Sequence, residues 1–175
     1  FISIEKHPVL RPDLARAHGL GNPAAADIAP DHPALAQRLV PAWPDPTPGW
    51  HTLHFDEPVN ASGRLQGVTL QLGLGDVADL LPSLVAQVDA FYLDGLATDH
   101  DLDKRDAGWL SRLNRHAAPG ATAASGCADP SVLAVLTQAG FIVEDAPGLT
   151  GAPDLIRAHY APRYTPAPLR WPAWW

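Results

Sequence analysis

The chain has 175 residues, of which 46% are apolar and 18% charged, and this is enough to bury the core of one domain. No stretch approaches the roughly 18 uncharged apolar residues of a membrane-spanning helix, which argues against a membrane protein. A net charge of -7 argues against a general nucleic-acid binder, because phosphate neutralisation by basic residues supplies most of such affinity.

The single cysteine, Cys127, excludes an internal disulfide framework and a cysteine-rich zinc site. The sequence also has no basic segment followed by an apolar one, so no signal peptide is predicted. Both observations favour a cytoplasmic location. The sequence contains no methionine and begins directly with "FISIEKHP", so we interpret it as a fragment or a processed chain.

The first half alternates between strand-like and helix-like segments. "FISI" (1–4) is β-branched and predicts a strand, and "RPDLARAHGL" (11–20) predicts a helix with proline in its first turn. Residues 31–43 repeat the helical pattern, with Asp31 as a possible N-cap. The arms "WHTLHF" and 67–74 alternate in polarity like a hairpin.

The second half continues the alternation. Residues 76–87 predict a helix that Pro82 kinks or shortens, and 88–94 form a continuous apolar run typical of a strand buried in a parallel sheet. The remaining predicted elements are an amphipathic helix at 107–120 stopped by Pro119-Gly120, a short strand at 121–125, a helix at 129–140 capped by Asp129, and two final strands at 141–146 and 154–162.

Alternation of this kind predicts an α/β three-layer sandwich with a mostly parallel sheet. The two final strands follow one another without a helix, so the sheet is expected to end in an antiparallel hairpin. Ligands of such sheets bind at the carboxyl ends of the strands.

Three acidic residues follow predicted strands and are therefore candidate site residues. They are Glu5, Asp76 and Asp94. A carboxylate at such a position can accept hydrogen bonds from both hydroxyls of a ribose. For each acid taken alone, a helix cap or a solvated loop is the simpler interpretation.

Other motifs carry less weight. His51 and His54 are three apart in a strand and should point to opposite faces, which disfavours a metal site, and Cys127 has no evident base partner. The acidic run 99–106 lacks the pattern of a calcium loop. Arginines among C-terminal aromatics could contact nucleic acid, although a Pro-rich tail packed on the domain is the simpler interpretation.

Four segments of the chain resemble a known family in order and spacing. They are "FISIEKHPVLRPDLARAH", "GVTLQLGLGDVADLLPSL", "VDAFYLDGLA" and "LTQAGFIVEDAPG". Together they resemble the methyltransferase domain of the MnmC family, the tRNA 5-methylaminomethyl-2-thiouridine biosynthesis bifunctional proteins. The resemblance covers nearly the whole chain.

The resemblance implies a class I S-adenosylmethionine-dependent methyltransferase fold, which is Rossmann-like. Residues 1–165 would form a partial methyltransferase domain and 166–175 a Pro/Trp-rich tail. The chain starts at what would be the family's second strand, so the first strand and the glycine-rich loop after it are expected to be missing.

The resemblance also implies roles for individual residues. Glu5, with the neighbouring Lys6, would bind the ribose of the cofactor, and Asp76, with Gly75 and Val77, would lie near its adenine. Asp94 would be the catalytic acid that faces the substrate amine, with Gly95 and Leu96 beside it. The segment after Asp94 departs from the family's pattern, and Leu96 replaces a phenylalanine.

The implied activity is methyl transfer to the aminomethyl group of wobble 5-aminomethyl-2-thiouridine in tRNA, once the missing N-terminal segment is supplied. The implied partners are tRNA and an FAD-dependent oxidase domain, fused or separate, whose FAD site is absent here. The net charge of -7 disfavours tRNA. The alternatives are a methyltransferase-fold enzyme with a different acceptor, and a non-catalytic degenerate fragment.

Overall fold

The structure is a computed structural model, and the chain divides into two compact units, Phe1–Ser83 and Leu84–Trp175. Each unit is described by itself. The predicted boundary between a domain and a tail at residue 166 lies outside the described residues. The structure describes residues 1–20, 33–57, 66–93, 107–126, 129–146 and 155–162.

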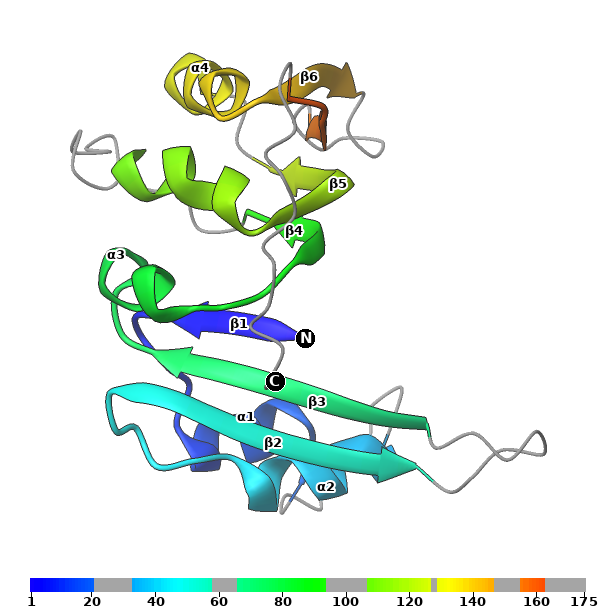
Figure 1. Ribbon diagram of the computed structural model, residues 1–175. Helices are drawn as coiled ribbons and strands as arrows, with labels where there is room; N and C mark the ends of the chain where they lie inside the picture. Colours follow the sequence, from blue (N-terminus) through cyan, green and yellow to red (C-terminus); the bar gives the residue numbers. More distant parts are fainter. Residues whose placement is uncertain (21–32, 58–65, 94–106, 127–128, 147–154, 163–175) are drawn as a thin grey trace, which may run out of the picture. The chain divides into compact units, whose positions relative to one another are not determined.

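The first unit contains a three-stranded sheet in the order β1-β3-β2. β1 (Ile2–Glu5) pairs in parallel with β3 (Gln66–Leu74), and β2 (Gly49–Glu57) pairs with β3 in antiparallel register along its whole length. The predicted hairpin is therefore confirmed (Figure 1).

The two faces of this sheet differ in what covers them. One face carries the buried side chains of Leu53, Leu72 and Leu74, against which Leu39 and Trp43 pack. Leu39 belongs to α2 (Pro33–Ala42), which lies beside α1 (Arg11–Ala17). The alternation of a strand places Trp50 and Gly73, which are paired across β2 and β3, on the other face.

The helix predicted at 76–87 is much shorter in the structure. α3 spans Val77–Leu80 and continues into a single 3-10 turn, η2 (Leu81–Ser83). Pro82 lies in this turn, and the chain from Leu84 to β4 is neither helix nor strand. A proline cannot supply the backbone N–H of a continuing helix, which explains the early end.

The second unit contains a four-stranded sheet in the order β4-β5-β7-β6. β4 (Val88–Tyr92) and β5 (Ala117–Ser125) are parallel, whereas β7 (Leu155–Tyr160) runs antiparallel to both β5 and β6 (Phe141–Ala146). The mixed α/β class and the antiparallel hairpin at the end are therefore confirmed.

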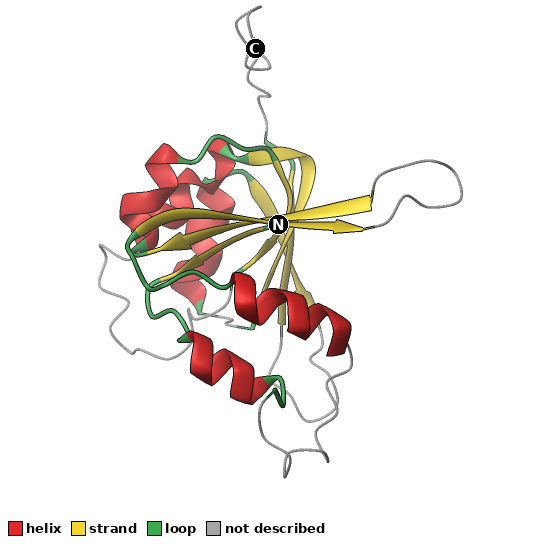
Figure 2. Cartoon of the chain, turned by 90° about the horizontal axis from the view of Figure 1, so that it is seen from below, coloured by secondary structure: helices red, strands yellow, loops and turns green. Residues whose placement is uncertain are grey.

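Two helical segments accompany this sheet, and one of them corrects the sequence interpretation. α4 (Pro130–Gln138) begins as predicted, because the Asp129 side chain accepts a hydrogen bond of 2.7 Å from the Ser131 amide. It packs against β6 and against η3 (Ala107–Arg115), which is a 3-10 helix. Figure 2 shows the helices of the chain in red and its strands in yellow. The expected helix at 107–120 was wrong in extent.

Pro119 and Gly120 were predicted to stop that helix, but both lie within β5, which starts at Ala117. The register between β4 and β5 shifts between Val88 and Ala90, and this irregularity accommodates the proline. β4 also differs from expectation, since it is an edge strand among the described residues and its Tyr92 is 80% exposed rather than buried.

Gly73→Ala should destabilise the first unit by about 1–3 kcal/mol, the usual cost of overpacking. A Cβ at this position would lie 3.0 Å from both Leu80 Cδ1 and Trp50 Cζ3. Urea denaturation measures the change. Gly108→Ala is the control because a Cβ there meets nothing within 4 Å. An equal effect of both substitutions would contradict the described packing.

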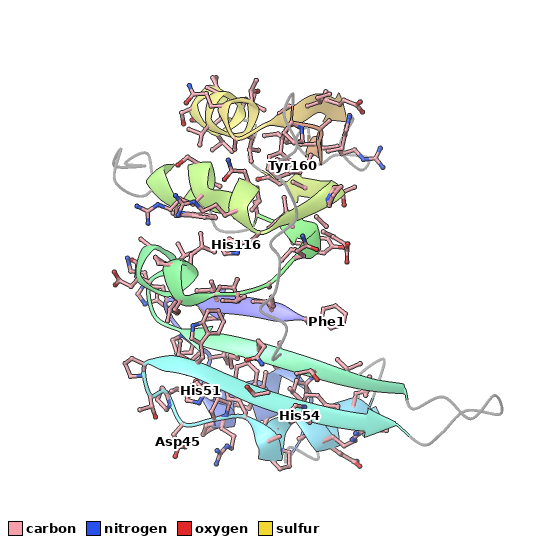
Figure 3. All side chains as sticks on the ribbon, viewed as in Figure 1. Phe1, Asp45, His51, His54, His116 and Tyr160 are labelled. Atoms are coloured by element: carbon pink, nitrogen blue, oxygen red, sulfur yellow. The ribbon has the colours of Figure 1, made fainter. Side chains whose placement is uncertain are left out.

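The stability of the second unit should depend on pH through His116. Its side chain is buried, and burial lowers its pKa from the ordinary value of 6.5, despite a hydrogen bond with the Ala86 backbone that opposes the shift (Figure 3). The unfolded chain therefore binds a proton more readily, so stability is full above pH 6.5 and falls as the pH drops toward the folded pKa.

We expect the free energy of unfolding to decrease from about pH 7 to pH 5, and His116→Gln to remove part of that slope. His54→Gln, at an exposed histidine of the first unit, is the comparison variant. Denaturation curves measured across this range test both variants. A slope that is the same in His116→Gln as in the unmodified protein would contradict the assignment.

Candidate functional site

The carboxyl ends of β1 and β3 form one edge of the first unit's sheet, and the candidate site lies there. The parallel register places Glu5 opposite Leu74, and the Gly75 amide donates a hydrogen bond of 3.0 Å to the Glu5 carbonyl oxygen. Glu5 and Asp76 therefore follow neighbouring strands at the same edge, as the sequence predicted.

The Glu5 side chain is an exposed hydrogen-bond acceptor. Its Oε1 accepts a hydrogen bond of 2.9 Å from the hydroxyl of Ser3, which lies two residues earlier on the same face of β1. This bond orients the carboxylate and leaves lone pairs on both oxygens for further donors.

Asp76 is held by two partners. Its Oδ1 accepts a hydrogen bond of 2.9 Å from the Ala78 amide, which makes it the N-cap of α3, and its Oδ2 lies 3.0 Å from the Lys6 ammonium. The Ala78 amide, and after it Lys6, lower the pKa of Asp76 below its ordinary value of 3.8. The carboxylate is therefore ionised at neutral pH.

Gly75 and Val77 flank this carboxylate. Gly75 has a φ of +144°, which side-chain-bearing residues rarely adopt, so the turn between β3 and α3 requires a glycine. Val77 is the first residue of α3. The structure thus brings together five of the predicted residues, while their roles toward a cofactor stay predictions: Glu5, Lys6, Gly75, Asp76 and Val77.

The predicted catalytic acid Asp94, and with it Gly95 and Leu96, lies outside the described residues. The chain is described as far as Leu93, which is buried. The Leu93 amide donates a hydrogen bond of 2.8 Å to Ala124, and its carbonyl accepts one of 3.0 Å from the Ser125 hydroxyl. These bonds hold the carboxyl end of β4 to β5, immediately before Asp94.

Sequence reasoning missed two residues beside the Asp76 turn, Trp50 and Ser83. The Trp50 indole N–H donates a hydrogen bond of 2.9 Å to the Ser83 hydroxyl. A signal for this contact was present, because a glycine inside a strand marks a close approach, and Gly73 lies between two leucines of β3.

The structure also bears on the weaker candidates from the sequence, which were two histidines, the C-terminal arginines and the cysteine. His51 and His54 point to opposite faces as predicted, with hydrogen bonds to Thr47 and Thr69, respectively (Figure 3). Within the described ranges, no three His, Cys, Asp or Glu side chains gather as metal ligands. Arg157 is exposed and lies opposite Glu144 in the pairing of β7 with β6. Cys127 lies outside the described ranges.

No helix in the described part of the chain is long and apolar enough to cross a membrane.

The chain matches a known protein family. The sequence model of the family described as S-adenosyl-L-methionine-dependent methyltransferase matches residues 30–161. That segment includes the Asp76 turn and every element from α2 to β7.

Curated relatives carry the name tRNA 5-methylaminomethyl-2-thiouridine biosynthesis bifunctional protein MnmC. The relative from Methylibium petroleiphilum is 46% identical over 96% of this chain, and the chain covers 23% of its length. The relatives from Burkholderia vietnamiensis and Cupriavidus metallidurans are 40% and 41% identical over 94% and 93% of the chain, which covers 23% and 22% of them. The chain thus spans less than a quarter of the length of each.

Asp76→Ala should cost about 0.5–2 kcal/mol of stability, the usual effect of losing an N-cap, and Asp76→Asn less, because the amide oxygen still accepts from Ala78. The lowered pKa means that this contribution is present above pH 3.8 and is lost as the pH falls through the folded pKa. Urea denaturation measures both variants. Asp79→Ala, in the same turn, is the control, and a loss as large as that of Asp76→Ala would argue against the cap.

Proposed function

Because the chain belongs to the S-adenosyl-L-methionine-dependent methyltransferase family, we propose that it takes part in methyl transfer to the aminomethyl group of wobble 5-aminomethyl-2-thiouridine in tRNA. The observation that carries this proposal is the pair of carboxylates, Glu5 and Asp76, at the carboxyl ends of two neighbouring parallel strands. The 46% identity to an MnmC relative supports this choice of acceptor.

The chemistry of these side chains fits the cofactor. An adenosine presents two ribose hydroxyls and an exocyclic amine, all hydrogen-bond donors, and an ionised carboxylate is an acceptor only. Glu5 is exposed and accepts from Ser3, and one third of the Asp76 side chain surface (33%) is open to solvent. In this proposal Glu5 binds the ribose and Asp76 the adenine amine.

Lys6 has a second function in this arrangement. The ammonium lies 3.0 Å from Asp76 Oδ2, and an opposite charge at this distance favours the ionised form of the carboxylate. Lys6 thereby helps to keep Asp76 ionised, which is the state in which this side chain accepts hydrogen bonds from a nucleoside.

The cofactor supplies an electrophilic methyl group on a sulfonium. The acceptor is an amine, which must present a neutral lone pair in line with that methyl. We assign Asp94 to orient the amine and to take the proton that the nitrogen would lose as the C–N bond forms and the methyl–sulfur bond breaks, which would leave the cofactor as a neutral thioether. This role rests on the resemblance of "LDG" to the family's pattern.

The remaining parts of the proposal concern partners and context. Residues 1–165 would act as one methyltransferase domain, followed by the tail 166–175, in the cytoplasm. An FAD-dependent oxidase, fused or separate, would prepare the amine. Because the chain has a net charge of -7, tRNA binding would depend on local basic groups or on other parts of the protein.

A methylation assay tests the acceptor. The protein is incubated with methyl-labelled S-adenosyl-L-methionine and bulk tRNA from cells that lack the methylated wobble nucleoside, and the nucleosides are then separated. We expect label in 5-methylaminomethyl-2-thiouridine alone. Cofactor binding without any transfer to tRNA would contradict this acceptor and favour a different substrate.

Asp94→Asn should lower kcat by roughly 10²–10⁴-fold, the usual contribution of a general base, with little change in KM for the cofactor. The asparagine keeps the shape of the side chain and loses its basicity. Steady-state kinetics in the same assay measure both constants, with Asp89→Asn on β4 as the matched control. An unchanged kcat would exclude Asp94 as the base.

A further inference from the structure

The indole of Trp50 lies over Gly73 on the face of the sheet opposite the leucine core. A Cβ added to Gly73 would lie 3.0 Å from Trp50 Cζ3 and 3.0 Å from Leu80 Cδ1. The missing side chain of Gly73 therefore allows the indole of β2 and the last residue of α3 to meet over the backbone of β3. Any larger residue would push them apart.

Two hydrogen bonds continue this contact. Trp50 Nε1 donates to the Ser83 hydroxyl at 2.9 Å, and the same hydroxyl donates to the Leu80 carbonyl oxygen at 2.8 Å. Ser83 thus acts as both acceptor and donor. Together the packing and the two bonds form a tether from β2 to the end of α3, which we call the Trp50–Ser83 tether.

α3 depends on such support because it has only four residues. A helix this short does not persist by its own hydrogen bonds, since nucleation costs more than one turn returns. Three of its amides, those of Ala78, Asp79 and Leu80, bond to a single residue, Asp76. Ala78 donates to Asp76 Oδ1, and the amides of Asp79 and Leu80 both donate to the Asp76 carbonyl oxygen at 3.1 Å.

The position of Asp76 is therefore fixed from two sides. Gly75 ties it to β1 through the Glu5 carbonyl, and α3 ties it to the tether at Leu80. If the tether is lost, the turn of α3 that surrounds the Asp76 carboxylate loses its anchor on the sheet.

We propose that Trp50 and Ser83 are positioning residues for the cofactor site. They hold α3 on the sheet so that the Asp76 carboxylate keeps its place at the sheet edge where Glu5 ends β1. The identity of the ligand rests on the proposed function, whereas the mechanical role of the tether does not.

Other polar contacts on this face of the sheet connect β2 only to β3. Thr52 bonds to Gln71, and His54 to Thr69, each directly across from β2 to β3. These pairs join strands that are already paired along their length. Only the Trp50 pair continues to α3 among the hydrogen bonds of the described residues.

The test compares Ser83→Ala and Trp50→Phe with a matched control, Ser111→Ala. Ser111 likewise donates to the carbonyl three residues earlier, that of Gly108 at 2.7 Å, but it lies in η3 of the other unit. Ser83→Ala and Ser111→Ala each remove one hydroxyl, whereas Trp50→Phe removes the indole N–H together with part of the ring that packs over Gly73. None of the three introduces a larger or charged side chain, so all three variants should fold.

Two quantities are measured on each variant. Hydrogen exchange of the Ala78, Asp79 and Leu80 amides reports the stability of α3, and calorimetric titration with S-adenosyl-L-homocysteine reports the site. We expect Ser83→Ala and Trp50→Phe to exchange roughly 5-fold faster or more and to bind about 5-fold more weakly, as for one lost hydrogen bond. Ser111→Ala should change neither quantity.

The two measurements separate the claims. Unchanged amide exchange in both tether variants would overturn the tether, and faster exchange with unchanged affinity would overturn its role in positioning Asp76. If the unmodified protein does not bind the ligand, the proposed function is contradicted instead. The exchange rates would then still decide whether the tether holds α3.

Discussion

The parallel pairing of β1 with β3 is the constraint on which the candidate site depends. Its register places Glu5 opposite Leu74, so the chain leaving β3 turns at Gly75 with the Glu5 carbonyl as its partner. The φ of +144° at Gly75 then directs Asp76 to the start of α3. Two acidic residues about 70 positions apart in sequence come to the same sheet edge through this single register.

That arrangement produces a site with a defined chemical preference. Both acids are hydrogen-bond acceptors, and the pKa of Asp76 is lowered by the Ala78 amide and Lys6, so it remains an acceptor at neutral pH. A sheet edge of this kind selects ligands rich in donors, and the hydroxyls and amine of an adenosine meet that requirement. The match to the methyltransferase family agrees with this chemistry.

The sequence predicted the elements whose signals are local. The β-branched run of β1, the alternation of β2 and β3, and the Asp129-Pro130 start of α4 each depend on a few neighbouring residues, and each was found. The wrong extent of the helices at 76–87 and 107–120 has a different origin. Apolar spacing indicated how far each could extend, whereas Pro82 and the pairing of β5 with β4 and β7 decided where it ended.

The Trp50–Ser83 tether could not be predicted from the sequence. Trp50 and Ser83 are 33 residues apart, and they meet because β2 and β3 are paired with Trp50 opposite Gly73. Gly73 was visible as an isolated glycine in a strand, but its partner could be identified only once the register was known. The candidate acids were easier to find because strand ends are marked by the chain itself.

Calorimetric titration of S-adenosyl-L-methionine against the protein and its Glu5→Gln variant tests the central claim most directly. The glutamine retains an acceptor for Ser3 but loses the charge and one acceptor oxygen toward the ribose. The account predicts about 10-fold weaker binding by Glu5→Gln with an unchanged melting temperature, as for the loss of a charge-assisted hydrogen bond. Equal affinities of the two proteins would contradict it.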